Sequence, residues 1–317
     1  MRILLMSPND GETNLYIQRG FEALGCEVIQ FDYRRHDLAY ALHNAPQVNP
    51  DFILITKGEI FGPEAIEFLN GVAITAIWQF DTWFPRADYE QVIGKANYYF
   101  SMVREFVEPL RELGVNAYWV PEAACPVVHK PEELLLASER NYYVSDITFI
   151  GSLGLPIHAG RTAFLQDIAQ RALDLKLDFK VFGRQYGPIL SELSRCYMKT
   201  EARGVAHNKA VMGARINLEV SAMPYLDMGQ SARVYRLLAA GGFVLSQRVK
   251  GEDEFFKDGE HLIYFDDAAD CWRKILIYLK DKVERERIAA SGCHEVLSKH
   301  LFLHRAKQIL NILKEAA

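Results

Sequence analysis

The sequence predicts an α/β protein built from two parallel-sheet domains that face a cleft. Three observations predict it. The 317 residues are about twice the length of a typical domain. Apolar runs of strand length alternate with helical stripes in both halves, as in a parallel sheet covered on both faces. The pattern breaks once, over residues 126–145. We therefore expect domains over residues 1–125 and 146–300, a linker over 126–145, and a last helix over 301–317 that packs back on the first domain.

The first half carries six apolar runs of strand length, at residues 3–6, 27–31, 52–55, 72–78, 98–100 and 117–120. Two helical stripes separate some of these runs, and each is followed by a glycine where a helix C-cap is expected. These are residues 17–24 with Gly25 and residues 107–113 with Gly114. The alternation predicts a sheet whose strands are buried on both faces.

The second half repeats this alternation after a proline-containing, charged stretch that we interpret as the linker. Strands are expected at residues 147–150, 179–182, 214–220, 243–246 and 262–265. Helices are expected at about 160–175, 230–240, 268–282 and 301–314. Ligands of open parallel sheets bind at the carboxyl ends of the strands, so candidate site residues should lie in the loops that follow them.

Composition excludes several classes of function. The net charge is −5, from 36 Lys and Arg against 41 Asp and Glu, which argues against a nucleic-acid partner. No apolar run of about 18 residues is present, so no transmembrane segment is expected, and the N-terminal apolar run is too short for a signal peptide. The five cysteines are widely spaced without a CxxC pair, which favours free thiols and a cytoplasmic location.

The chain also lacks the common catalytic signatures. It contains no GxGxxG fingerprint, P-loop, HExxH or GxSxG motif. His294, His300 and His304 stand on a late helical segment at spacings of 6 and 4. That spacing favours a surface helix over a metal site. We therefore expect neither a metal nor a resident cofactor.

The strongest candidate segment begins at Gly229 and opens a helix. Gln230 and Ser231 fall at the helix N-terminus, where unpaired N–H groups and a partial positive charge favour an anion such as a diphosphate. Arg233, one turn further, would add a charge-assisted contact. The alternative is an ordinary core helix with an exposed arginine.

Three other loops are weaker candidates. Gly151 and Ser152 follow a strand and precede Arg161, and Gly183 follows the next strand, but ordinary strand–glycine turns have the same pattern. Asp81 lies among aromatic residues at a strand end in the first half. A carboxylate there suits a general base, and the aromatic faces suit stacking on a sugar. The alternative is an aspartate that caps a helix before Pro85.

The second half resembles a known family. The run Ser231-x-Arg233-x-Tyr235-x-x-x-Ala239-x-Gly241-Gly242-Phe243-x-Leu245-Ser246 resembles the donor-site helix of GT-B glycosyltransferases, and most closely that of the CgeB-like spore-maturation group within the glycosyl transferase family 1-like proteins. Residues 149–152 with Arg161, residues 254–265 and residues 284–292 resemble further segments of that group. The resemblance covers most of residues 145–310 and is weaker over 1–125.

The resemblance implies two Rossmann-like domains and transfer of a sugar from a nucleotide-diphosphate sugar, of the UDP, GDP or TDP type, without a metal. The acceptor would be a glycan, a lipid, a protein or a small molecule, and Asp81 would be the catalytic base. The donor-binding residues that it implies are Gly151, Ser152, Arg161, Gly183, Val205, Ser221, Gly229, Gln230, Ser231, Arg233 and Tyr235. The acceptor-side residues are Asn9, Gly11, Trp78 and Trp83.

One residue departs from the family pattern. Many relatives carry a glutamate after the aromatic residue at Tyr235, where it holds the ribose hydroxyls, and this sequence has Arg236. A guanidinium cannot accept hydrogen bonds from hydroxyls. Two further functions therefore stay open, which are a non-catalytic nucleotide- or sugar-binding protein and a nucleotide-sugar epimerase.

Overall fold

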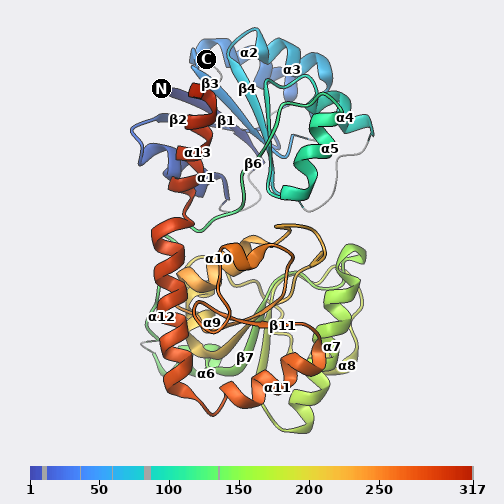
Figure 1. The fold of residues 1–317 in the computed structure, drawn as a ribbon, viewed down its shortest axis with the longest axis vertical. Coiled ribbons are helices and arrows are strands. Elements are labelled where there is room, and N and C mark those ends of the chain that lie inside the picture. The colour runs from blue at the N-terminus through green and yellow to red at the C-terminus, as the bar shows by residue number, and fades with distance from the viewer. Residues whose placement is uncertain (9–12, 36, 59, 82–86, 135, 316–317) are drawn as a thin grey trace. The chain divides into compact units, whose positions relative to one another are not determined.

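The computed structural model describes residues 1–8, 13–35, 37–58, 60–81, 87–134 and 136–315. The chain forms two compact units (Figure 1). Unit 1 comprises Met1–Ala123, Leu226–Gly229 and Leu301–Ala317, and unit 2 comprises Ala124–Tyr225 and Gln230–His300. The residues expected to link two domains therefore fall within unit 2, where they include the helix α6 (Ala137–Tyr143).

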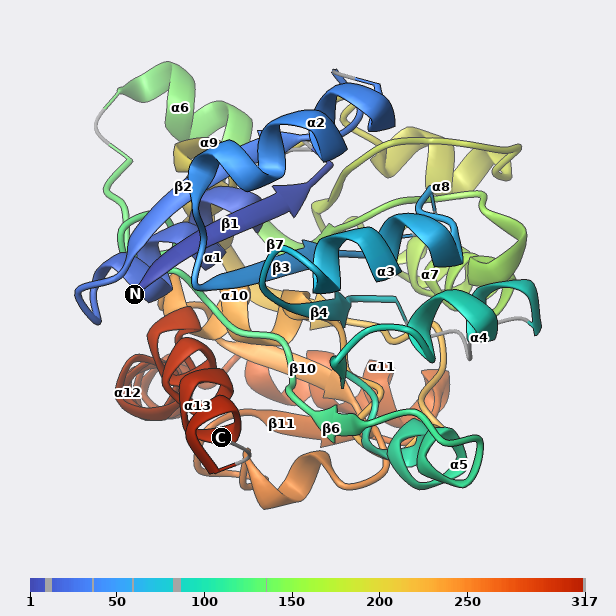
Figure 2. The same ribbon diagram turned by 90° about the horizontal axis from the view of Figure 1, so that it is seen from above.

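Unit 1 is built on a six-stranded parallel sheet with the order β2-β1-β3-β4-β5-β6. Several of these strands follow one another across the view in Figure 2. Their bounds are β1 (Arg2–Ser7), β2 (Glu27–Asp32), β3 (Phe52–Thr56), β4 (Ile74–Gln79), β5 (Tyr98–Ser101) and β6 (Ala117–Trp119). All five residues of β3 are buried, as expected for a central strand covered on both faces.

The helices of unit 1 include three that the apolar pattern did not predict, namely α2 (Leu38–Val48), α3 (Pro63–Asn70) and α4 (Ala87–Ile93). The others are α1 (Thr13–Glu22), α5 (Val107–Glu112) and α13 (Phe302–Glu315). The C-terminal helix α13, red in Figure 1, packs on α1. A Cβ on Gly20 would lie 2.6 Å from the carbonyl oxygen of Phe302, so only glycine permits this approach.

Unit 2 is built on a five-stranded parallel sheet with the order β11-β10-β9-β7-β8. The strands are β7 (Ser145–Ile150), β8 (Phe179–Phe182), β9 (Ala214–Glu219), β10 (Val244–Gln247) and β11 (Ile263–Phe265). Besides α6, the helices are α7 (Ala159–Asp174), α8 (Ser191–Cys196), α9 (Val205–Gly213), α10 (Ala232–Ala239), α11 (Ala268–Tyr278) and α12 (Lys282–Lys299). The two parallel sheets confirm the α/β fold class.

Two expectations near the C-terminus are wrong. The helix expected at residues 268–282 ends at Tyr278, because Asp281 caps a new helix, α12, by accepting the N–H of Glu284 at 3.0 Å. His300 does not lie on a surface helix. It is buried at the end of α12, and its ring lies 4.5 Å from that of Phe255.

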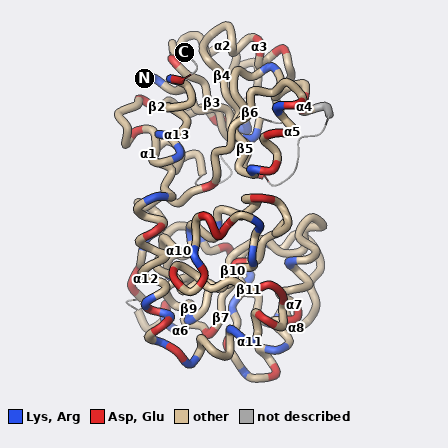
Figure 3. Tube along the Cα trace, in the orientation of Figure 1, with Lys and Arg blue, Asp and Glu red and all other residues tan. Residues whose placement is uncertain are grey.

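The charge distribution agrees with the composition. Acidic and basic residues are interspersed along both units (Figure 3). None of the helices in the described part of the chain combines the length and the apolar character that a membrane crossing needs.

Candidate functional site

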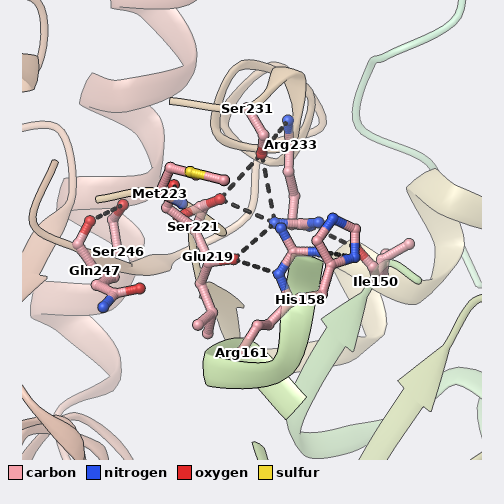
Figure 4. Close-up of polar contacts among 11 residues, drawn as sticks. Ile150, His158, Arg161, Glu219, Ser221, Met223, Ser231, Arg233, Ser246 and Gln247 are labelled. Atoms are coloured by element: carbon pink, nitrogen blue, oxygen red, sulfur yellow. Dashed lines mark hydrogen bonds and ion pairs between the residues drawn. The ribbon is translucent and has the colours of Figure 1, made fainter. Parts of the chain in front are cut away.

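Polar side chains of unit 2 gather where β7 and β9 end and where α7 and α10 begin (Figure 4). Carboxyl ends of parallel strands meet at one edge of the sheet, so residues far apart in the sequence become neighbours there. The group contains Arg161, Glu219, Ser231 and Arg233, which we call the arginine cluster, with His158 beside it.

Arg233 ties three elements together. Its Nε donates to the carbonyl oxygen of Ile150 at 2.6 Å, and its Nη1 lies 2.9 Å from Oε1 of Glu219. The side chains of Arg233 and Glu219 are 12% and 1% exposed. Burial lowers the pKa of Arg233, and the Glu219 carboxylate opposes that change. The alternative expectation of an exposed arginine on an ordinary helix is therefore wrong.

Ser231 is the N-cap of α10. Its Oγ accepts the N–H of Arg233 at 3.3 Å and donates to Oε1 of Glu219 at 3.1 Å. Gln230, the preceding residue, is buried and donates to the hydroxyl of Tyr235 at 2.7 Å. Tyr235 is completely buried, so it offers no surface for direct contact with a ligand.

Arg161 brings a second positive charge to the cluster. Its Nε donates to the carbonyl oxygen of Val220 at 2.9 Å, and Nη1 of Arg233 lies 3.3 Å from the same oxygen. Burial, followed by the charge of Arg233, lowers the pKa of Arg161 to about 9, so it stays charged at neutral pH. Nη1 of Arg161 also lies 3.2 Å from Nδ1 of His158.

The electrostatic balance of the cluster favours an anion. Burial, followed by the charges of Arg161 and Arg233, lowers the pKa of His158 to about 4, so this ring is neutral at pH 7. Two guanidinium groups then stand against one carboxylate, that of Glu219. A net positive, largely buried group beside a helix N-terminus is an environment in which a phosphate is stabilised.

Two glycine loops meet beside this cluster. The N–H of Gly151 donates to the carbonyl oxygen of Phe182 at 2.8 Å. Gly183 has a φ of 154°, and a Cβ on it would lie 1.9 Å from the carbonyl oxygen of Gly151. A Cβ on Gly151 would lie 2.6 Å from Nη2 of Arg233. The absence of a side chain at Gly183 therefore lets the two loops approach each other, and its absence at Gly151 leaves room for the guanidinium group of Arg233.

The remaining donor-side residues are more scattered. Ser221 is buried, and its Oγ accepts the N–H of Met223 at 3.3 Å. Ser152 follows Gly151 and is partly exposed. Val205 is exposed at the start of α9, and Gly229 falls in the short segment that groups with unit 1. Neither Val205 nor Gly229 hydrogen-bonds within the arginine cluster among the described residues.

The sequence did not single out Glu219 or His158. Glu219 had a visible signal, because Arg215, Asn217 and Glu219 alternate with apolar residues along β9 and so share one face of the strand. His158 is a lone histidine at the end of a short 3-10 helix (Pro156–His158), where no such pattern is present. Its role follows only from its contact with Arg161.

The acceptor-side expectations fall in unit 1. Asp81 follows β4, and its Oδ2 lies 3.8 Å from Nζ of Lys57. Trp78 is buried, donates from Nε1 to the carbonyl oxygen of Val120 at 3.1 Å, and packs against Phe80. Asn9, Gly11 and Trp83 lie outside the described residues. So does Pro85, on which the alternative role of Asp81 as a helix cap depends.

A cavity of about 150 Å³ adjoins Asp81. It is lined by Pro8, Thr13, Asn14, Thr56, Lys57, Phe80, Asp81 and Glu122. Within the ranges that the structure describes, no group of three His, Cys, Asp or Glu side chains is placed to hold a metal ion.

Fold and site together define a class of protein. The chain has the GT-B fold, as its likeness to solved glycosyltransferase structures shows. HepE from Anabaena in complex with UDP-glucose matches with a TM-score of 0.68 at 10% identity, over 99% of this chain and 100% of that one. Sucrose-phosphate synthase from Thermosynechococcus elongatus matches with a TM-score of 0.66 at 11% identity, over 100% of this chain and 99% of that one.

A comparison of the sequence with models of protein families agrees with the likeness in fold. Residues 161–311 match the family model described as glycosyl transferase-like, a range that begins at Arg161 and includes Glu219, Ser231 and Arg233. No curated protein matches the sequence. The family match and the fold together support glycosyl transfer as the activity of this chain.

Proposed function

We propose that this protein transfers a sugar from a nucleoside diphosphate sugar to a hydroxyl group of an acceptor. The observation that carries the proposal is the arginine cluster, in which two guanidinium groups face one carboxylate beside the N-terminus of α10. A diphosphate is the part of such a donor that this charge would bind. The HepE structures with UDP and with UDP-glucose support a uridine nucleotide as the first donor to test.

In the reaction one bond forms, one bond breaks and one proton is transferred. The acceptor oxygen forms a bond to the anomeric carbon of the sugar while the bond from that carbon to the diphosphate oxygen breaks. The electron pair of the broken bond leaves with the diphosphate, whose growing negative charge the arginine cluster stabilises. In an inverting reaction the acceptor proton passes to the Asp81 carboxylate. In a retaining reaction Asp81 positions the acceptor instead, and the acceptor proton passes to the oxygen of the departing diphosphate. No step in this scheme requires a metal.

The resemblance to the CgeB-like group and a cytoplasmic location are parts of the same proposal. The run from Ser231 to Ser246 supports the first, and five free cysteines in the described residues support the second. The base of the donor, whether uracil, guanine or thymine, is identified by titration.

Calorimetric titration tests the donor site directly. UDP, GDP, TDP, CDP and ADP would each be titrated into the full chain, with uridine as a control that lacks the diphosphate. We expect one nucleoside diphosphate to bind and its nucleoside to bind at least tenfold more weakly. Equal affinity for UDP and uridine, or no binding of any diphosphate, would overturn the assignment of the arginine cluster.

Arg236 favours a second candidate, a protein that binds a nucleotide sugar without transferring the sugar. Burial lowers the pKa of the His129 and His207 rings, and the positive charge of Arg236 lowers each further, so Arg236 lies near a neutral, buried pair. If the donor binds but is never consumed in the presence of acceptor extracts, this candidate replaces the first. Arg236→Glu would then be the variant in which to look for turnover.

A further inference from the structure

The cavity beside Asp81 lies wholly within unit 1 and is formed where three parallel strands end. Pro8 follows β1, Thr56 ends β3, and Phe80 and Asp81 follow β4. Its volume is about 150 Å³. A protein cavity of about that size admits a single six-membered ring such as benzene, so the space suits one ring and not an extended chain.

The lining of the cavity is polar. Only Pro8 and Phe80 among its eight lining residues are apolar, and the rest offer hydroxyl, amide, ammonium and carboxylate groups. The ring of Phe80 lies 4.5 Å from that of Trp78, which is itself buried and hydrogen-bonded, so the aromatic face is rigidly supported. One flat aromatic face surrounded by hydrogen-bonding groups matches the two sides of a sugar ring, with its C–H face and its hydroxyl edge.

The charges of the lining disfavour an anion. Lys57 is the only cation among the lining residues, against the carboxylates of Asp81 and Glu122. The ammonium of Lys57 stands 3.8 Å from Oδ2 of Asp81, which offsets one of the two negative charges. A phosphate or carboxylate on the ligand would therefore meet a net negative lining.

Lys57 is held in place by its backbone. It has a φ of 67°, in the left-handed region that is costly for a residue with a side chain. Its N–H donates to the carbonyl oxygen of Trp78 at 3.0 Å, and its own carbonyl oxygen accepts from the hydroxyl of Tyr89. Two hydrogen bonds from the neighbouring β4 and from α4 thus maintain a strained backbone that brings Lys57 to Asp81.

We infer that this cavity binds one neutral, hydroxylated six-membered ring, a pyranose or a cyclitol, as the terminal unit of the acceptor. Lys57 is a positioning residue that orients the Asp81 carboxylate toward a hydroxyl of that ring. This inference rests on the proposed function, because it assigns the acceptor class of the same reaction. Lipid chains and anionic acceptors are the alternatives that the lining disfavours.

Saturation-transfer NMR on the full chain tests the inference without a donor sugar, in the presence of saturating UDP so that the arginine cluster is already occupied. The probes are methyl β-glucopyranoside, methyl β-galactopyranoside, methyl α-mannopyranoside and myo-inositol, compared with glucose 6-phosphate and octanoate. We expect transfer to at least one neutral ring and none to the phosphate or the fatty acid. Transfer only to octanoate, or only to glucose 6-phosphate, would overturn the inference, as would transfer to no probe.

Substitutions of residues that line the cavity test whether the ring binds there. Thr56→Val removes one hydroxyl without changing side-chain size, and we expect about fivefold weaker binding of the ring. Phe80→Leu should abolish the signal. Lys95→Gln, which removes a surface ion pair with Glu67 in the same unit, is the matched control and should leave binding unchanged. Unchanged binding in both cavity variants would place the ring elsewhere.

The role of Lys57 is tested by turnover. Lys57→Met should lower kcat at least tenfold with little change in donor KM, and Lys57→Arg should restore most of it by supplying a cation at the same position. Equal loss in both variants would mean that the lysine acts only in folding. Because UDP titration reports on unit 2 separately, a protein that binds UDP but no ring refutes this inference while leaving the proposed function intact.

Discussion

Arg233 and Glu219 form an ion pair of 2.9 Å in which both side chains are almost completely buried. Glu219 ends β9 and Arg233 lies in the first turn of α10, so the pair fixes the start of the helix to the end of the strand. The same guanidinium also holds the last residue of β7. The pair is therefore both a structural link and the core of the proposed phosphate site.

Removing one partner of this pair should lower the free energy of unfolding more than removing both partners. Arg233→Met leaves a buried carboxylate without its cation and should lower the free energy of unfolding by about 3–5 kcal/mol. Arg233→Met combined with Glu219→Met should recover most of that loss, because the buried carboxylate is removed together with its cation. Urea denaturation of the two variants measures the difference. Strictly additive losses would show that the two side chains are not energetically coupled.

The affinity for a diphosphate should depend on the presence of Arg233 and not on the stability of the fold. The double variant is expected to fold and yet to bind UDP at least tenfold more weakly than the natural chain, because the guanidinium group in the first turn of α10 is gone and only that of Arg161 remains to contact the diphosphate. Calorimetry at a temperature where both proteins are folded checks this. Natural affinity in the double variant would move the phosphate away from α10.

Asp81→Asn should separate chemistry from donor binding. The amide keeps the shape of the side chain but cannot take the acceptor proton, so we expect kcat to fall about 10²- to 10⁴-fold while the Kd for UDP is unchanged. Initial rates of UDP release, measured with a saturating acceptor, give the first quantity. Turnover at the natural rate would remove Asp81 from the mechanism.

Glu252 should make the protein less stable as the pH rises. Its carboxyl is 1% exposed, and neither oxygen has a hydrogen-bond partner among the described residues. Burial, and then the charge of Glu219, raise the pKa of Glu252 well above its usual range. The folded state therefore holds this proton at pH values where the unfolded state, with a pKa of about 4.3, has released it.

The sign of this effect is testable with an isosteric amide. Stability from the retained proton is complete below the unfolded pKa and falls as the pH rises toward the folded pKa. Glu252→Gln removes the dependence, so its advantage in free energy of unfolding over the natural chain should grow between pH 5 and pH 8. Glu133→Gln, at an exposed position, is the control and should show no such trend. An advantage that is constant across this range would contradict the assignment.

Gly183 should not tolerate even alanine. Its φ of 154° and the 1.9 Å approach of a Cβ to the carbonyl oxygen of Gly151 require the two loops to separate. We expect Gly183→Ala to lower the melting temperature by several degrees and to weaken UDP binding. Gly160→Ala is the matched control, since a Cβ there meets no atom within 4 Å. Similar behaviour of the two variants would show that the loops adapt freely.

The sequence by itself determined the α/β class and the strands of both sheets. A local apolar run such as Phe52–Thr56 predicts a strand that is buried on both faces, and this pattern can be recognised within the segment itself. It also pointed to Ser231 and Gly151, because caps and glycine turns depend on neighbours in the chain. The helices α2, α3 and α9 were not predicted, because α2 contains Pro46 and because α3 and α9 are only 8 and 9 residues long.

The tertiary structure decided which charges meet. Arg161, Glu219 and Arg233 are separated by up to 72 positions in the sequence and converge only because β7 and β9 are neighbours in the sheet. Lys57 reaches Asp81 because β3 pairs with β4 and its backbone adopts a left-handed conformation that no local pattern reveals. Which charges pair and where cavities form depend on distances between residues in the folded chain, and the pattern of residues along the sequence does not contain those distances.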